Sequence, residues 1–213
     1  MESSFWHQMW EDGELGFHEG QPNLMLTSCF HKLDLPVGAR VFLPLCGKTR
    51  DIAWLLDLGY RVVGAELSEL AIRQLFSELG LEPEVKEIAG FRHFSSGNLD
   101  VFVGDVFGIT STLLGAVDAT YDRAAIVALP KEMRKKYTAH LMTLTGNGPQ
   151  LVITYEYDQD LLPGPPFSVT ELEIREHYNA CYQICALASA SVEGGLKGVA
   201  DAVCKAWLLN KVE

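Results

Sequence analysis

The sequence predicts an α/β fold: a doubly wound, mostly parallel seven-stranded sheet that ends in a C-terminal antiparallel β-hairpin. Two observations support this prediction. From residue 40 onward, short apolar segments rich in β-formers alternate with helical segments at the spacing of β-α units. The end of the chain instead holds two strand-like segments around a glycine-rich loop. The 213 residues are enough for one domain, residues 1–213, and too few for two ordinary ones.

The first two β-α units are expected between residues 40 and 80. Ile52, Leu55 and Leu56 follow the first apolar run at a helical spacing, and Gly59 comes where that helix should end. Ser68 is placed to cap the next helix. The expected elements here are strands at 40–43 and 60–66 and helices at 49–58 and 69–79.

The rest of the chain continues the alternation with longer connections. Within residues 90–107 we expect a strand, a Ser-Ser-Gly-Asn turn and a return strand that ends near Asp105. Pro130 suits the first turn of a helix, and Ser168 with Glu171 forms a capping box for another. The remaining expected elements are a strand running into a loop at 119–129, a strand at 150–158, a helix at 169–178 and two terminal strands, at 182–192 and about 202–210.

Charge and composition narrow the classes of partner. The formal net charge is −11, with lysines and arginines scattered along the chain, so neither a nucleic acid nor a membrane is expected as a partner. The start, MESSFWHQMWEDGE, has neither the basic nor the apolar region of a secretory signal. No apolar run approaches the roughly 20 residues of a membrane span. The five cysteines lack paired metal spacing, so we expect reduced thiols in a cytoplasmic protein.

The run VFLPLCGKTRDIAWLL contains the end of a phosphate-loop motif, Gly47-Lys48-Thr49, directly after a strand. The first glycine of that motif would fall at position 42, which is Phe42, and Pro44 removes a backbone N–H donor. A dinucleotide site would need three glycines in this turn, and it has one. The turn therefore predicts a ligand without a pyrophosphate, whose amino acid end approaches the backbone at Gly47.

Glu66, at the end of the second expected strand, lies 19 residues after Gly47. In doubly wound folds an acid at about this interval binds the ribose hydroxyls of a nucleotide. The alternative is a surface glutamate that caps the following helix. The terminal hairpin also indicates a nucleoside ligand. A parallel sheet that ends in a β-hairpin is the plan of class I S-adenosylmethionine (SAM) methyltransferases.

At these residues the sequence resembles the thiopurine S-methyltransferase family, specifically its bacterial branch. The resemblance runs almost from end to end. It rests on five blocks in the family's order: WHQMWEDGELGFHEG, VFLPLCGKTRDIAWL, VVGAELSELAI, YDRAAIVALP and PGPPF. The resemblance implies transfer of the SAM methyl group to the sulfur of thiopurines and related aromatic thiols. A selenium or tellurium species is an alternative natural acceptor, in a detoxification role.

The resemblance also implies site residues. The cofactor contacts of the family correspond to Trp10, Leu45, Glu66 and Arg123, with Trp6, Gly47 and the loop Val106–Phe107 as secondary contacts. Phe17 and the PGPPF segment would lie near the acceptor, and Asp105 could reach the adenine amino group. Residues 1–39 are expected to form a leader that covers the site as a lid.

Each implied role has a physical reason and a simpler alternative. The indole face of Trp10 can stabilise the SAM sulfonium through a cation–π contact of about 0.5–2 kcal/mol; alternatively, Trp6 and Trp10 form the apolar face of an N-terminal helix. Arg123 follows an apolar strand, where an unpaired guanidinium would be costly to bury. Its partner would be the SAM carboxylate or, alternatively, Asp122 or another carboxylate.

No catalytic base and no metal site are expected. An aromatic thiol is already partly ionised near neutral pH, so methyl transfer mainly needs proximity and orientation. His18 alone among the histidines is placed where a lid would bring it to the site, and Arg123 is a candidate acceptor contact. Metal-ligand spacings are absent from the sequence. Rival hypotheses are an O- or N-methyltransferase, a phosphate-loop NTPase and a SAM-binding protein without activity. The expected oligomeric state is a monomer.

Overall fold

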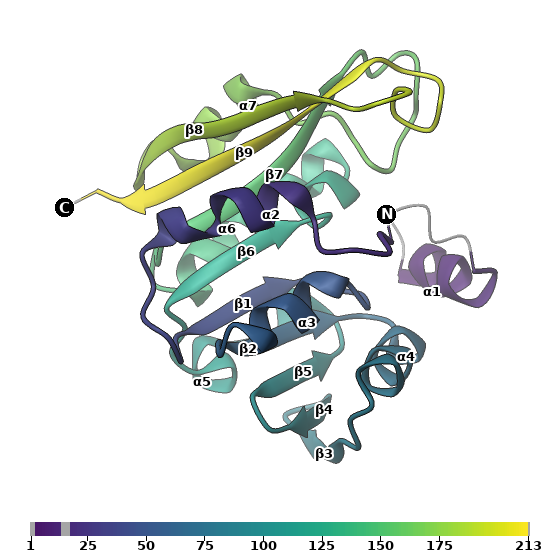
Figure 1. Cartoon of the computed structure of the whole chain (residues 1–213), viewed down its shortest axis with the longest axis vertical. Coiled ribbons are helices and arrows are strands. Elements are labelled where there is room, and N and C mark those ends of the chain that lie inside the picture. The colour runs from purple at the N-terminus through teal and green to yellow at the C-terminus, as the bar shows by residue number, and fades with distance from the viewer. Residues whose placement is uncertain (1–2, 14–17, 213) are drawn as a thin grey trace.

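The computed structural model describes residues 3–13 and 18–212. In this part of the chain, nine strands form a single mixed sheet in the order β3-β4-β5-β2-β1-β6-β7-β9-β8 (Figure 1). The strands are β1 (Arg40–Pro44), β2 (Arg61–Glu66), β3 (Glu84–Ile88), β4 (Phe91–Ser96), β5 (Leu99–Val103), β6 (Ala119–Arg123), β7 (Gln150–Tyr157), β8 (Tyr182–Ser191) and β9 (Ala202–Lys211).

The doubly wound α/β prediction is confirmed, but the predicted number of strands is wrong. Seven neighbouring strands, from β5 to β8 in the sheet order, match the expected sheet with its terminal hairpin, and the β4–β5 hairpin lies where it was expected. The strand without a predicted counterpart is β3, which pairs antiparallel with β4 at the sheet edge. All five β3 residues are exposed. The segment EVKEI therefore lacks the buried apolar pattern by which a strand is recognised in a sequence.

The topology brings the ends of the parallel strands to one edge of the sheet. β1 pairs in parallel with β2 on one side and with β6 on the other, and β5 and β7 extend the two halves in the same direction. The chain order thus reverses between β1 and β6. In open α/β sheets ligands bind at such a switch point, outside the carboxyl ends of the strands.

Helices cover both faces of the sheet. Leu26 of α2, Ile52 of α3 and Ile72 of α4 pack in one apolar cluster, whereas Tyr137 of α6 and Ile174 of α7 pack in the cluster on the other face. The helices are α1 (Ser3–Glu11), α2 (Leu24–Cys29), α3 (Arg50–Asp57), α4 (Glu69–Leu79), α5 (Ser111–Leu114), α6 (Lys131–Leu144) and α7 (Glu171–Tyr178), with short 3₁₀ turns η1 (Phe30–Leu33), η2 (Val106–Gly108) and η3 (Ile126–Ala128).

Helix ends agree with the predicted caps at α4 but not at α7. Ser68 caps α4 by accepting from the Ala71 N–H, and Gly80 ends this helix with a left-handed φ of 65°. α7 is capped by Thr170, not by Ser168. The Ser168 hydroxyl instead accepts from the backbone N–H of Tyr157 at 3.0 Å. The predicted capping box is therefore wrong, because a tertiary contact with β7 uses the serine.

The N-terminal segment has two different parts. α2 and η1 belong to the core, since Leu26, Cys29 and Phe30 are buried in the same cluster as β1 and β2. α1 lies apart from them, beyond the carboxyl ends of the parallel strands (Figure 1). Of residues 1–39, α2 and η1 therefore belong to the core, whereas α1 lies at the carboxyl edge of the sheet.

α6 and α7 are joined by a buried ion pair. The guanidinium of Arg134 donates to both carboxylate oxygens of Glu173, at 2.6 and 2.9 Å. His177 lies 3.2 Å from the same carboxylate. Burial raises the pKa of Glu173, but the His177 and Arg134 contacts outweigh it and lower this pKa to about 2.

The terminal hairpin brings a loop to the ligand-binding edge. β9 is antiparallel to β7, and the pairing of Tyr157 with Ala202 places residues 192–201 at the carboxyl end of β7. The five cysteines are all free thiols. Among the helices of the described residues, none is long and apolar enough to span a bilayer.

Candidate functional site

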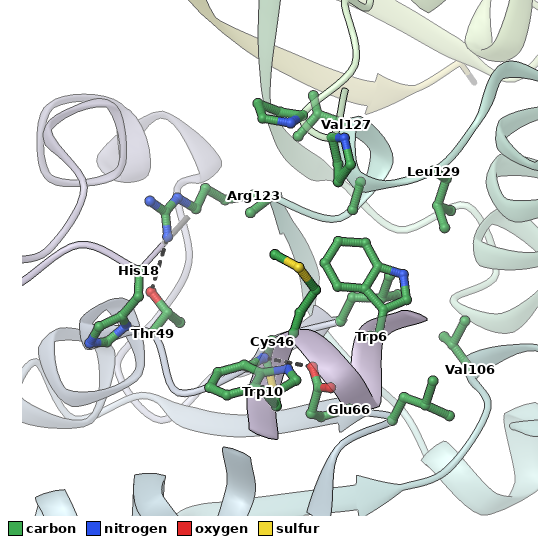
Figure 2. A pocket seen from close by; sticks show the side chains of 18 of the residues that line it. Trp6, Trp10, His18, Cys46, Thr49, Glu66, Val106, Arg123, Val127 and Leu129 are labelled. Carbon is green, nitrogen blue, oxygen red and sulfur yellow. Dashed lines mark hydrogen bonds between the residues drawn. The ribbon is translucent and has the colours of Figure 1, made fainter. Parts of the chain in front are cut away.

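A cavity of about 1000 Å³ opens at the carboxyl edge of the sheet, over the switch point between β1 and β6. It has the size of a typical small-molecule site. Its walls come from α1, the β1–α3 turn, the ends of β2 and β6, the loop after β5 and the β8–β9 loop. Figure 2 shows Trp10, Glu66 and Arg123 among the side chains around it. The residues predicted to contact the cofactor all line this one cavity: Trp6, Trp10, Leu45, Gly47, Glu66, Val106, Phe107 and Arg123.

The β1–α3 turn wraps tightly around one end of the cavity. Leu45 and Gly47 both adopt left-handed backbone conformations, with φ of 49° and 52°. The Cys46 N–H donates to the carbonyl of Ala65, 3.0 Å away, and ties the turn to β2. A Cβ atom on Gly47 would lie 3.1 Å from the Trp10 ring. The glycine therefore lets the indole pack directly on the turn, and Trp10 is 4% exposed.

Glu66 is a buried acid that connects two turns. Its Oε2 accepts from the Gly47 N–H at 2.8 Å, and its Oε1 accepts from the Ser68 N–H at 2.8 Å. Burial raises the pKa of Glu66, and the two N–H donors oppose that shift. Each carboxylate oxygen has a further lone pair. The alternative of a surface glutamate is therefore wrong, although the side chain does bind the first N–H groups near α4.

Arg123 ends β6 with its side chain 7% exposed. Its Nη2 pairs with Oε1 of Glu19 at 2.5 Å, and its Nη1 lies 3.5 Å from the Thr49 hydroxyl. Burial disfavours the charged guanidinium, but nearby carboxylates, first Asp51 and then Glu19, outweigh it and raise the pKa of Arg123. In this structure the partner of Arg123 is therefore a carboxylate of the chain itself, Glu19, as the simpler alternative predicted.

Asp122 is not the partner of Arg123, because it points to the other side of the sheet. Its carboxylate accepts from the Ile126 N–H at 3.0 Å and from the Tyr137 hydroxyl at 2.8 Å. Burial raises the pKa of Asp122 to about 6. Asp122 thus stabilises the loop after β6, while the neighbouring Arg123 faces the cavity.

Glu19 joins the N-terminal segment to the sheet. Besides Arg123, its carboxylate accepts from the Asn23 side-chain amide at 3.1 and 3.2 Å. The Asn23 N–H donates to Asp51 at 2.7 Å, and Asp51 also accepts from the Tyr121 hydroxyl at 3.1 Å. A continuous polar network therefore fixes the chain just before α2 against α3 and β6.

The loop after β5 forms the wall next to β2. Asp105 caps η2 by accepting from the Phe107 N–H at 3.0 Å, and Val106 is largely buried. The Val106 carbonyl lies 2.9 Å from a ring nitrogen of His140. Asp105, Val106 and Phe107 all line the cavity. This part of the wall is apolar with one acid, which suits the face and the amino group of an adenine.

The other residues named from the sequence differ in whether they line the cavity. Phe17 lies outside the described residues. Gly164, Pro165 and Pro166 of the PGPPF segment line the cavity. His18 lines it too, and burial, followed by the charge of Lys48, lowers the pKa of the imidazole. Lys48 pairs with Glu78 at 2.6 Å and so has a structural partner.

The sequence did not reveal several residues of the cavity. Glu19 and Thr49, the partners of Arg123, were not predicted, and neither were Tyr155 and Lys197. A buried arginine signals that some carboxylate must lie nearby, but only the folded chain identifies Glu19. Within the described residues no group of three or more His, Cys, Asp or Glu side chains is arranged to hold a metal ion.

Known proteins match this chain over nearly its whole length. The family model described as thiopurine S-methyltransferase matches residues 1–205. The thiopurine S-methyltransferase of Xanthobacter autotrophicus is 53% identical over 212 residues, 99% of this chain and 100% of the relative. That of Gluconobacter oxydans is 48% identical over 203 residues, 95% of this chain and 92% of the relative.

A solved structure shares the fold at low sequence identity. It is the 1,6-didemethyltoxoflavin-N1-methyltransferase of Burkholderia thailandensis, with bound 1,6-didemethyltoxoflavin and S-adenosylhomocysteine. The TM-score is 0.63 at 19% identity, over 98% of this chain and 87% of that one. The fold, the cavity at the switch point and the two full-length relatives agree. The chain belongs to the thiopurine S-methyltransferase family.

Proposed function

We propose that this chain is a SAM-dependent S-methyltransferase, which transfers the methyl group of SAM to the sulfur of thiopurines and related aromatic thiols and releases S-adenosylhomocysteine. Membership of the family supports the reaction. The observation that carries the proposal is the buried Glu66 beside a turn with a single glycine, both facing one cavity. That arrangement suits a nucleoside with an amino acid end and no pyrophosphate.

The residues of the cavity fit each part of SAM. Glu66 has lone pairs left for the ribose hydroxyls. The turn at Leu45 and Gly47, with Arg123 across from it, would hold the amino acid end, and Val106 with Phe107 would cover the adenine. Trp10 and Trp6 present indole rings where a sulfonium gains from a cation–π contact. Phe17 stays a predicted acceptor contact.

Bound there, SAM supplies a methyl group on a positively charged sulfur, which an acceptor thiolate attacks in line. The chain has to hold the acceptor sulfur at about 3–3.5 Å from that methyl group and to keep water away. Trp6, Val127 and Leu129 line the cavity and would exclude water. Burial raises the pKa of Tyr155 to about 12, so this cavity residue stays protonated and is no base at neutral pH.

The acceptor atom can be tested with matched compounds. Purified protein is incubated with methyl-labelled SAM and, in parallel, thiophenol, phenol, aniline, selenite and tellurite. The proposal expects labelled thioether from thiophenol and none of the O- or N-methylated products. Methylation of selenite or tellurite at a higher kcat/KM would make such a species the natural acceptor. SAM binding without any methylated product would leave a binding protein, and no SAM binding would overturn the proposal.

We further propose that the enzyme acts as a cytoplasmic monomer on small molecules, without a nucleic acid or membrane partner, and that α1 acts as a lid. The net charge of −11 supports the absence of an anionic partner. α1 supports a lid because Phe5, Trp6 and Met9 line the cavity from one short helix. Light scattering coupled to gel filtration would measure the mass in solution, and a dimer mass would contradict the monomer.

A further inference from the structure

The β8–β9 loop presents a lysine at the rim of the cavity. Leu196 and Lys197 of this loop line the cavity. The loop is held by its own backbone: Leu196 and Ala200 exchange N–H to carbonyl bonds of 2.7 and 3.3 Å, and the Gly195 N–H donates to Val192 at 3.0 Å. Lys197 has a left-handed φ of 53° between these contacts. The loop therefore holds the lysine backbone in a defined place.

Most positive charges of the cavity wall are already compensated. Lys48 pairs with Glu78 at 2.6 Å, and Arg123 pairs with Glu19 at 2.5 Å. The imidazole of His18 has a lowered pKa, mainly because of burial. In the described part of the chain, no carboxylate forms an ion pair with Lys197 within 4.0 Å. Its ammonium thus contributes a positive charge that no ion pair of these residues cancels.

The position of Lys197 in the sheet separates it from the ribose site. Glu66 ends β2, and the loop of Lys197 precedes β9, four strands away in the sheet order. Four strand spacings correspond to about 19 Å. Pro165 and Pro166, on the segment predicted to lie near the acceptor, line the cavity together with Lys197. Lys197 therefore lies toward the end of the cavity away from Glu66, next to the segment predicted to lie near the acceptor.

We propose that Lys197 determines specificity for the charge of the acceptor, by attracting thiols that carry a further negative group such as a carboxylate. The inference rests on the proposed function, because it assigns this end of the cavity to the methyl acceptor. Lys197 is exposed, so solvent and salt screen its charge. The expected preference is therefore modest, about fivefold in affinity and dependent on ionic strength.

The test compares 4-mercaptobenzoate, which carries a carboxylate, with thiophenol, which does not. Both are titrated calorimetrically into protein saturated with S-adenosylhomocysteine, at low and high salt. Lys197→Gln is expected to weaken 4-mercaptobenzoate binding about fivefold at low salt and to leave thiophenol binding unchanged. Lys197→Arg should retain the preference. Lys211→Gln, at an exposed lysine outside the cavity, is the charge-matched control and should change neither affinity.

The outcomes distinguish this inference from the proposed function. Equal effects of Lys197→Gln on both thiols, or no effect on either, would overturn the role of Lys197 whether or not the protein is an enzyme. An unchanged Tm and an unchanged affinity for S-adenosylhomocysteine would exclude misfolding of the variant. A lack of methyl transfer by the wild-type protein would overturn the proposed function alone, because the binding comparison does not depend on turnover.

Discussion

Replacement of Glu66 by glutamine tests both roles that the structure gives this side chain. The amide keeps one acceptor oxygen, but Gly47 and Ser68 each donate an N–H to the carboxylate at 2.8 Å. One of these buried donors then loses its acceptor, at a cost of about 1–3 kcal/mol. For a chain of this length, at about 2–4 °C for each kcal/mol, that lowers Tm by about 2–12 °C. Glu66→Ala would leave both donors without an acceptor, so the glutamine variant is the gentler probe.

The same substitution should weaken the binding of the cofactor. A carboxylate forms stronger hydrogen bonds with ribose hydroxyls than a neutral amide does, and a loss of about 2 kcal/mol corresponds to about thirtyfold in Kd. Calorimetric titration with SAM and thermal unfolding measure the two effects separately. Glu78→Gln, a carboxylate that pairs with Lys48 and Arg50, is the control and should leave the SAM affinity nearly unchanged. A lower Tm of Glu66→Gln with unchanged SAM affinity would refute the ribose site and leave Glu66 a purely structural residue.

Two further substitutions give separate predictions. Gly47→Ala should lower the free energy of unfolding by about 1–2 kcal/mol and weaken SAM binding several-fold. The reason is that residue 47 has a φ of 52° and that a Cβ there would lie 3.1 Å from the Trp10 ring. Gly80→Ala, at a φ of 65° with open space around it, carries the same backbone cost and should not affect SAM, so equal losses in both variants would contradict the contact. In the folded protein the pKa of the Glu173 carboxyl is about 2, whereas its ordinary value is 4.5. This carboxyl should therefore contribute about 3 kcal/mol to the free energy of unfolding above pH 4.5, and the contribution is lost as the pH falls toward 2. Urea unfolding at pH 7 and pH 3 should therefore show a smaller pH dependence for Glu173→Gln than for the wild type, and equal pH dependence would refute the assignment.

Local patterns predicted the elements around the cavity. The helix over Glu69–Leu79 agrees with its structure because Ser68 and Gly80 mark its ends and its apolar residues lie on one face. The doubly wound sheet was predicted from the alternation of strands and helices, and the terminal hairpin from two strand-like segments around a glycine-rich loop. β3 could not be predicted, because an exposed edge strand with alternating charges has no apolar face to detect.

Side-chain partners were harder to predict, because tertiary contacts decide them. The nearest acid in the sequence to Arg123 is Asp122, but successive residues of a strand point to opposite faces, and the guanidinium pairs with Glu19 instead. Ser168 has the spacing of a helix cap but accepts a bond from Tyr157. The position of Glu66 was predictable from its place after β2, whereas its bonds to two turns were not.

The most direct test of the central claim is methyl transfer to the sulfur of a thiopurine. Purified protein is incubated with methyl-labelled SAM and 6-mercaptopurine, and both products are identified by mass. The account predicts the S-methylated purine and an equal amount of S-adenosylhomocysteine. Label on a ring nitrogen, or bound SAM without any methylated purine, would contradict it.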